Sequence, residues 1–90
     1  MPKYVIEREV QGIGKLTPKE LQAAAQKSCA ALQKLGTDIH WVHSYVTADR
    51  TYCIYYAANE EIIKKHANAS GFPANRISQV STMIDPTTSE

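Results

Sequence analysis

The chain has 90 residues, of which 43% are hydrophobic and 21% charged, a mixture typical of one globular domain. Its formal net charge is +1, and its basic and acidic residues are interspersed along the chain. This distribution excludes the clustered positive charge by which proteins bind nucleic acid or anionic membranes. So small a domain leaves apolar area uncovered, and we therefore expect a homodimer.

The sequence shows no targeting or membrane segment. Its first ten residues mix charged with apolar side chains, and no apolar run approaches the roughly 18 residues of a membrane span. We therefore expect a cytoplasmic protein. In a reducing compartment, Cys29 and Cys53 are expected to be free thiols or metal ligands rather than a disulfide.

A strand and a long helix are predicted first. Residues 3–10 alternate in polarity with period two, which is typical of a strand with one drier face. Thr17 and Glu20 then have the spacing of a capping box, and they predict a helix over Pro18–Leu35 that ends at Gly36. The predicted inward stripe of this helix is Leu21, Ala24, Ala25, Ser28, Cys29, Leu32 and Leu35.

A hairpin, a second helix and a last strand follow. Residues 39–47 and 50–58 are rich in β-branched and aromatic side chains on either side of a short polar break, which favours a hairpin. Asn59 is the expected N-cap of a helix that ends at Gly71, and residues 76–84 are predicted to form a strand. The inward stripe of this second helix is Ile62, Ile63, His66, Ala67 and Ser70.

The order β-α-β-β-α-β predicts an α+β fold of the ferredoxin-like, split βαβ type. In that arrangement a four-stranded antiparallel sheet carries both helices on one face. Residues 1–85 would form this single domain, and residues 86–90 a polar C-terminal tail. The other sheet face, with its apolar and aromatic side chains, is expected to be covered by a second copy of the chain.

Imidazole and thiol side chains suggest a site for nickel, zinc or copper rather than for magnesium or calcium. None has CxxC or HxxxH spacing, so only the fold can bring them together. If the hairpin loop has three residues, His43 lies diagonal to Cys53 on one face of the sheet. If the loop has two or four residues, Cys53 instead shares a face with Ser44 and Val42. The candidate ligands are His40, His43, His66, Cys29 and Cys53.

An enzyme is the weaker alternative. His43 with Tyr45 and Tyr55 could perform acid-base chemistry, but no Ser-His-Asp set is evident. The segment GIGK lacks the full phosphate-binding loop pattern, and the aromatic strands lack the RNA-binding signature. The competing function is a dimeric α+β barrel enzyme or small-molecule-binding protein that uses the aromatic sheet face as a pocket.

Five segments together resemble a bacterial family of small proteins catalogued as a domain of unknown function. They are KYVIERE, LTPKELQAAAQKSCAALQKLG, HWVHSYVTADRTYCIYYA, EEIIKKHANASGFPANRISQV and IDPTT. Studied relatives are described as ferredoxin-like homodimers that bind nickel. The resemblance thus implies a homodimer and a nickel-binding protein for metal buffering, storage or sensing, with His43, His66 and Cys53 as ligands and Cys29 and His40 secondary.

Overall fold

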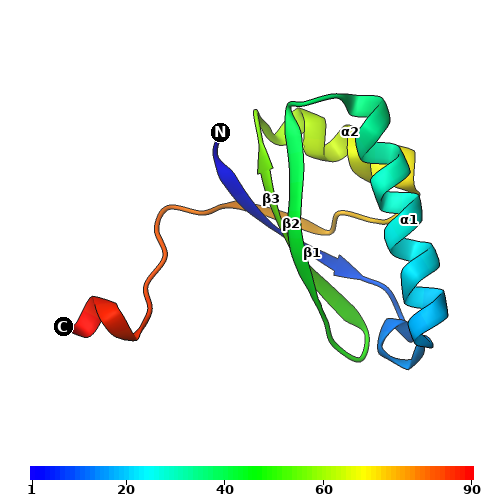
Figure 1. Ribbon diagram of the computed structural model, residues 1–90, viewed down its shortest axis with the longest axis horizontal. Coiled ribbons are helices and arrows are strands. Elements are labelled where there is room, and N and C mark those ends of the chain that lie inside the picture. The colour runs from blue at the N-terminus through cyan, green and yellow to red at the C-terminus, as the bar shows by residue number, and fades with distance from the viewer.

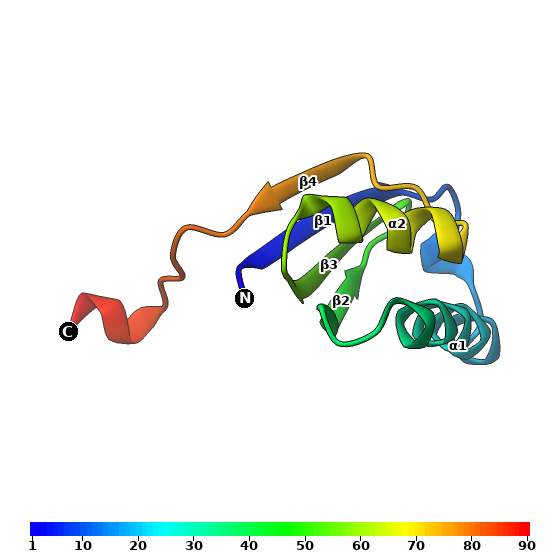
Figure 2. The same cartoon turned by 90° about the horizontal axis from the view of Figure 1, so that it is seen from above.

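A four-stranded antiparallel sheet with two helices on one face forms the body of the protein (Figures 1 and 2). The computed structural model describes all 90 residues. The order of the strands in the sheet is β2-β3-β1-β4, so the predicted ferredoxin-like fold is confirmed. The elements are β1 (Lys3–Glu9), α1 (Pro18–Leu35), β2 (Ile39–Val46), β3 (Arg50–Ala57), α2 (Glu60–Ser70), β4 (Arg76–Gln79) and the 3-10 turns Ile13–Lys15 and Pro86–Ser89.

The core lies between the sheet and the helices. Alternation along β1 buries Tyr4, Ile6 and Arg8, as predicted for its drier face, while Glu7 and Glu9 stay more accessible. Apolar area removed from water on this face is the main favourable contribution to folding. The core cluster consists of Tyr4, Ile6, Ile39, Cys53, Tyr55, Ala57 and Ile63.

The first helix begins and ends as predicted. The Thr17 hydroxyl accepts a hydrogen bond from the backbone N–H of Glu20, and the Glu20 carboxylate accepts one from the N–H of Thr17. The inward stripe is partly different from the prediction, because Cys29 is exposed while Ala31 is buried. The reason is that α1 packs mainly against α2, which turns its buried face away from Cys29.

The second helix also agrees with the prediction. The Asn59 side chain accepts a hydrogen bond from the N–H of Ile62, and Gly71 ends the helix with a left-handed backbone at φ 78°. The predicted inward residues other than Ile62 are fully buried, and Ile62 is half-buried. This helix therefore presents His66 to the interior of the protein.

The last strand is shorter than predicted. Residues 76–84 were expected to be extended and paired, but β4 ends at Gln79. The cause is that its partner β1 begins at Lys3, whose carbonyl accepts the last hydrogen bond, from the N–H of Val80. Beyond that point the chain leaves the body of the protein, as Figure 1 shows.

None of the helices is both long and apolar enough to cross a lipid bilayer.

Candidate metal centre

The register of the β2–β3 hairpin determines which candidate ligands share a face of the sheet. The N–H of Thr47 donates to the carbonyl of Arg50 at 2.9 Å, which leaves a loop of two residues. Cys53 is consequently paired with Ser44, and His43 with Ile54. Of the registers that the sequence left open, this one places Cys53 and His43 on opposite faces, because neighbouring positions of β3 alternate between the two faces.

A β-bulge at Val42 shifts the alternation within β2. Trp41 pairs with Tyr55 and His43 pairs with Ile54, so Val42 is an extra residue without a partner. The indole N–H of Trp41 donates to the Ser44 hydroxyl at 2.9 Å, and these two side chains lie toward the helices.

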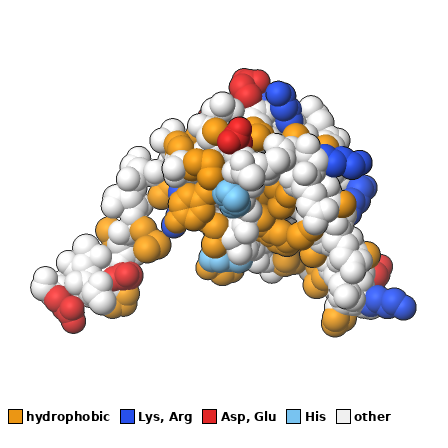
Figure 3. All heavy atoms as spheres, turned by 45° about the horizontal axis from the view of Figure 1, so that its top comes forward, with side chains coloured by type: hydrophobic (Ala, Val, Ile, Leu, Met, Phe, Trp, Pro, Cys, Tyr) orange, Lys and Arg blue, Asp and Glu red, His pale blue; other side chains and the backbone are white.

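His40 and His43 therefore share the open face of the sheet. They pair with Tyr56 and Ile54, which are alternate residues of β3 and project to the same side. Both imidazoles are exposed, and the bulge gives them the spacing of alternate strand residues, roughly 7 Å along the strand. Figure 3 shows histidine side chains at the surface next to hydrophobic ones. Two imidazoles so placed can approach one metal ion from the same side.

The ring of His43 also touches a tyrosine. Its centroid lies 5.0 Å from that of Tyr45, with an angle of 75° between the ring planes. This edge-to-face contact is a favourable geometry for two aromatic rings. It restricts the orientations that the His43 imidazole can adopt.

His66 lies on the helix side of the sheet and is 1% exposed. Its Nε2 is 3.2 Å from the Ser28 hydroxyl and 3.3 Å from the Ser28 carbonyl, while its Nδ1 has no partner. A carbonyl can only accept, so this contact assigns the proton to Nε2. Burial lowers the pKa of His66, the Ser28 carbonyl opposes that change, and the positive charge of Arg8 reinforces it. The imidazole is therefore neutral at pH 7.

The two cysteines do not join the histidine pair. Cys53 is buried, and its thiol donates to the Thr51 hydroxyl at 3.5 Å. Cys29 is exposed on α1. Within the chain no three His, Cys, Asp or Glu side chains converge as metal ligands would. The structure thus brings together His40 and His43 and separates them from Cys29, Cys53 and His66.

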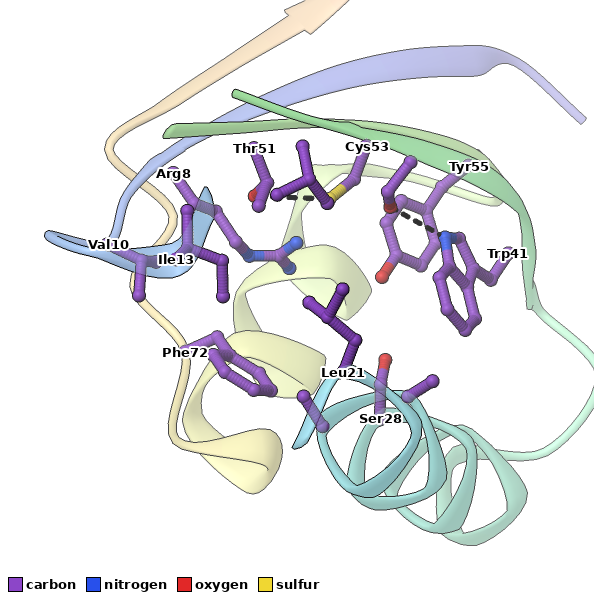
Figure 4. A pocket seen from close by; sticks show the side chains of 14 residues that line it. Arg8, Val10, Ile13, Leu21, Ser28, Trp41, Thr51, Cys53, Tyr55 and Phe72 are labelled. Atoms are coloured by element: carbon purple, nitrogen blue, oxygen red, sulfur yellow. Dashed lines mark hydrogen bonds between the residues drawn. The ribbon is translucent and has the colours of Figure 1, made fainter. Parts of the chain in front are cut away.

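The structure has a cavity between α1 and the sheet that the sequence patterns did not predict. It has a volume of about 200 Å³, and Arg8 points into it between Phe72 and Tyr55 (Figure 4). The signal that could have revealed it is the alternation of β1, which places a guanidinium on the drier face beside Tyr4 and Ile6. The side chains that line it include Arg8, Leu21, Ala24, Trp41, Tyr55 and Phe72.

Comparison with known proteins identifies the family. No curated protein matches the chain significantly. The fold is similar to that in the crystal structure of SCO4226 from Streptomyces coelicolor A3(2), with a TM-score of 0.76 and 16% sequence identity over 91% of this chain and 99% of the other. The sequence profile of the SCO4226-like nickel responsive proteins matches residues 4–80. The chain therefore belongs to the family of SCO4226-like nickel responsive proteins.

Proposed function

We propose that this protein binds nickel through the imidazoles of His40 and His43. The observation that carries the proposal is the bulge at Val42, which turns both histidines to the open face of the sheet. Imidazole nitrogen is a suitable ligand for nickel, as it is for zinc and copper. The description of the family as nickel responsive favours nickel among these metals.

A second copy of the chain would complete the metal site. Two imidazoles leave further coordination positions empty, and the chain offers no third ligand beside them. The open face also carries exposed apolar side chains, with Tyr45 60% and Tyr56 38% exposed, and burying them favours association. Two copies that meet through this face would bring four imidazoles together in a symmetric dimer.

Buffering, storage or sensing of nickel fits such a site better than catalysis. Both histidines are exposed, so the metal can enter and leave without any opening of the core. A dimer linked by the metal would also change its assembly state with nickel concentration, since ligand binding shifts a linked equilibrium. Cys29, Cys53 and His66 stay outside the proposed site, because they lie on the helix side of the sheet and His43 lies on its open face.

Calorimetric titration of nickel into the protein tests the proposal. We expect His40→Ala and His43→Ala each to lower nickel affinity at least about tenfold, because each removes one arm of the chelate. Cys29→Ser is the matched control, since it changes another exposed candidate ligand and should leave affinity unchanged. Equal affinity of the wild type and the His43→Ala variant would remove His43 from the site and refute the proposal.

A further inference from the structure

Arg8 carries a positive charge that no carboxylate neutralises. Its side chain projects from β1 into the cavity, and the residue is only 4% exposed. The two ion pairs of the protein join Arg50 to Glu9 and Arg76 to Glu7, so neither involves Arg8. A guanidinium remains charged at any pH relevant to proteins, and buried charges are normally paired. The charge of Arg8 therefore has no counterion among the side chains of the protein.

Only part of the guanidinium is used inside the protein. Its Nε donates to the Pro73 carbonyl at 2.9 Å, and its central carbon lies 5.7 Å from the centre of the Tyr55 ring. Its Nη2 is buried and has no hydrogen-bond partner. The bond to Pro73 explains how Arg8 holds the connection after α2 in place. It does not explain the free nitrogen, which is a strong donor left without an acceptor.

We infer that this cavity binds a small monocarboxylate with a compact apolar body, whose carboxylate is held by Arg8. An aromatic acid of the size of benzoate represents this class. A dry cavity of about 150 Å³ already admits benzene, and the volume here is about 200 Å³. The body of the acid would lie among the apolar walls that Leu21 and Trp41 provide (Figure 4), together with Ala24.

Tyr55 supplies a second donor for the carboxylate. Its hydroxyl points into the cavity between Arg8 and Ser28 (Figure 4). Burial raises the pKa of Tyr55, and the nearby charge of Arg8 only partly opposes this rise, so the hydroxyl keeps its proton. A protonated phenol and a guanidinium can both donate to one carboxylate, whereas a neutral amide or a cation would use them poorly.

Other polar side chains of the cavity, Ser28 among them, already take part in hydrogen bonds within the protein. The Trp41 indole N–H donates to Ser44, and the Cys53 thiol donates to Thr51. His66 lies behind Tyr55, with its ring centroid 5.4 Å away, and is neutral. The cavity thus presents one concentrated positive charge in otherwise apolar surroundings, which selects a single negative charge rather than a polyanion.

Trp41 makes the inference directly testable, because it lines the cavity and is the only tryptophan of the protein. Its fluorescence is followed while benzoate, benzamide and benzylamine are added separately. These probes share one ring and differ in charge. We expect benzoate to bind at least about tenfold more tightly than benzamide, and benzylamine to bind most weakly. Equal binding of benzoate and benzamide, or no response to benzoate, would overturn the inference.

Two variants locate the probe. Arg8→Met should abolish the preference for benzoate over benzamide, while Arg50→Met, which removes an exposed arginine, should retain it. Because Arg8→Met also loses the bond to Pro73, a second variant, Ala24→Leu, fills the cavity and leaves Arg8 in place. Its benzoate affinity should fall at least about tenfold. Wild-type affinity in a folded Ala24→Leu variant would place the probe elsewhere and refute the inference.

Discussion

His40 and His43 project from the same face of β2, although their positions in the chain are three residues apart. In an unbroken strand, residues three apart face opposite sides of the sheet. Here Val42 is an extra residue without a partner on β3, and the alternation restarts after it. With their positions three residues apart, His40 and His43 can share a face only because of the bulge.

Deletion of Val42 should preserve the proposed metal site. The deletion converts His-Trp-Val-His into His-Trp-His, and alternate residues of a regular strand share a face. We expect the nickel affinity of the variant, measured by calorimetry, to stay within about threefold of the wild type. As a control, exchange of Val42 for Ala keeps the number of residues and should have no larger effect. A folded deletion variant that no longer binds nickel would show that the bulge itself shapes the site.

Nickel should also promote association of the chains. If imidazoles from two copies share the metal, the molar mass in solution, measured by light scattering after gel filtration, should approach twice the monomer mass of 10.0 kDa at lower protein concentrations when nickel is present. The variant with both His40→Ala and His43→Ala should associate to the same extent with and without nickel. An unchanged mass distribution of the wild type on addition of nickel contradicts a shared site.

His66 should make the protein less stable in mild acid. Burial lowers its pKa in the folded state, so on acidification below the ordinary histidine value of about 6.5 the unfolded chain takes up the proton first. The contribution of neutral His66 to the free energy of unfolding is therefore fully present above that pH. It falls as the pH decreases below it, with a slope of at most about 1.4 kcal/mol per pH unit.

Urea unfolding at pH 7.5, 6.5 and 5.5 measures this slope. His66→Gln should be less stable at pH 7.5 and show a flatter dependence on pH, whereas His43→Ala, which changes an exposed histidine, should retain the wild-type slope. Glu20, whose pKa is lowered by hydrogen bonds from Thr17, loses its contribution only below about pH 4.5 and lies outside this range. If His66→Gln kept the wild-type slope, the loss of stability in mild acid would have to come from another group.

The sequence allowed the helices to be predicted better than the site, for physical reasons. Caps are local, so Thr17, Glu20 and Asn59 indicated the helix starts without knowledge of the rest of the fold. The hairpin loop contains no glycine that would select one turn type, and its register stayed open. The bulge was also hidden, because Trp41 and Val42 are both apolar and either could follow the pattern.

The surroundings of Arg8 and Cys29 also could not be predicted from sequence patterns alone. The alternation of β1 correctly placed Arg8 on the drier face, but a pattern cannot tell whether a charge there finds a partner. Cys29 was misplaced because helix periodicity defines a stripe only approximately, and packing of α1 against α2 rather than centrally on the sheet decided which edge of the stripe is covered. The partner of Arg8 and the burial of Cys29 both depend on contacts between elements that are distant in sequence.

Gly14 is expected to be essential for the contact between the first 3-10 turn and the β2–β3 loop. Its N–H donates to the Ala48 carbonyl at 3.0 Å, and a Cβ at this position would lie 2.6 Å from the Thr47 carbonyl oxygen and 2.8 Å from the Ala48 Cα. Both are backbone atoms that cannot rotate away, so Gly14→Ala must separate the two segments. We expect a loss of about 1–3 kcal/mol in the free energy of unfolding, as for other overpacked sites.

Gly12 is the matched control for this prediction, since it lies in the same turn. Its backbone is left-handed at φ 77°, but a Cβ there would meet no atom within 4 Å. Asparagine tolerates the left-handed conformation, so Gly12→Asn should cost about 1 kcal/mol or less. Urea unfolding of both variants separates steric overlap from backbone conformation. A Gly14→Ala variant as stable as the wild type would mean that the loop and the turn can move apart freely, because the overlap with backbone atoms leaves no other way to accommodate the methyl group.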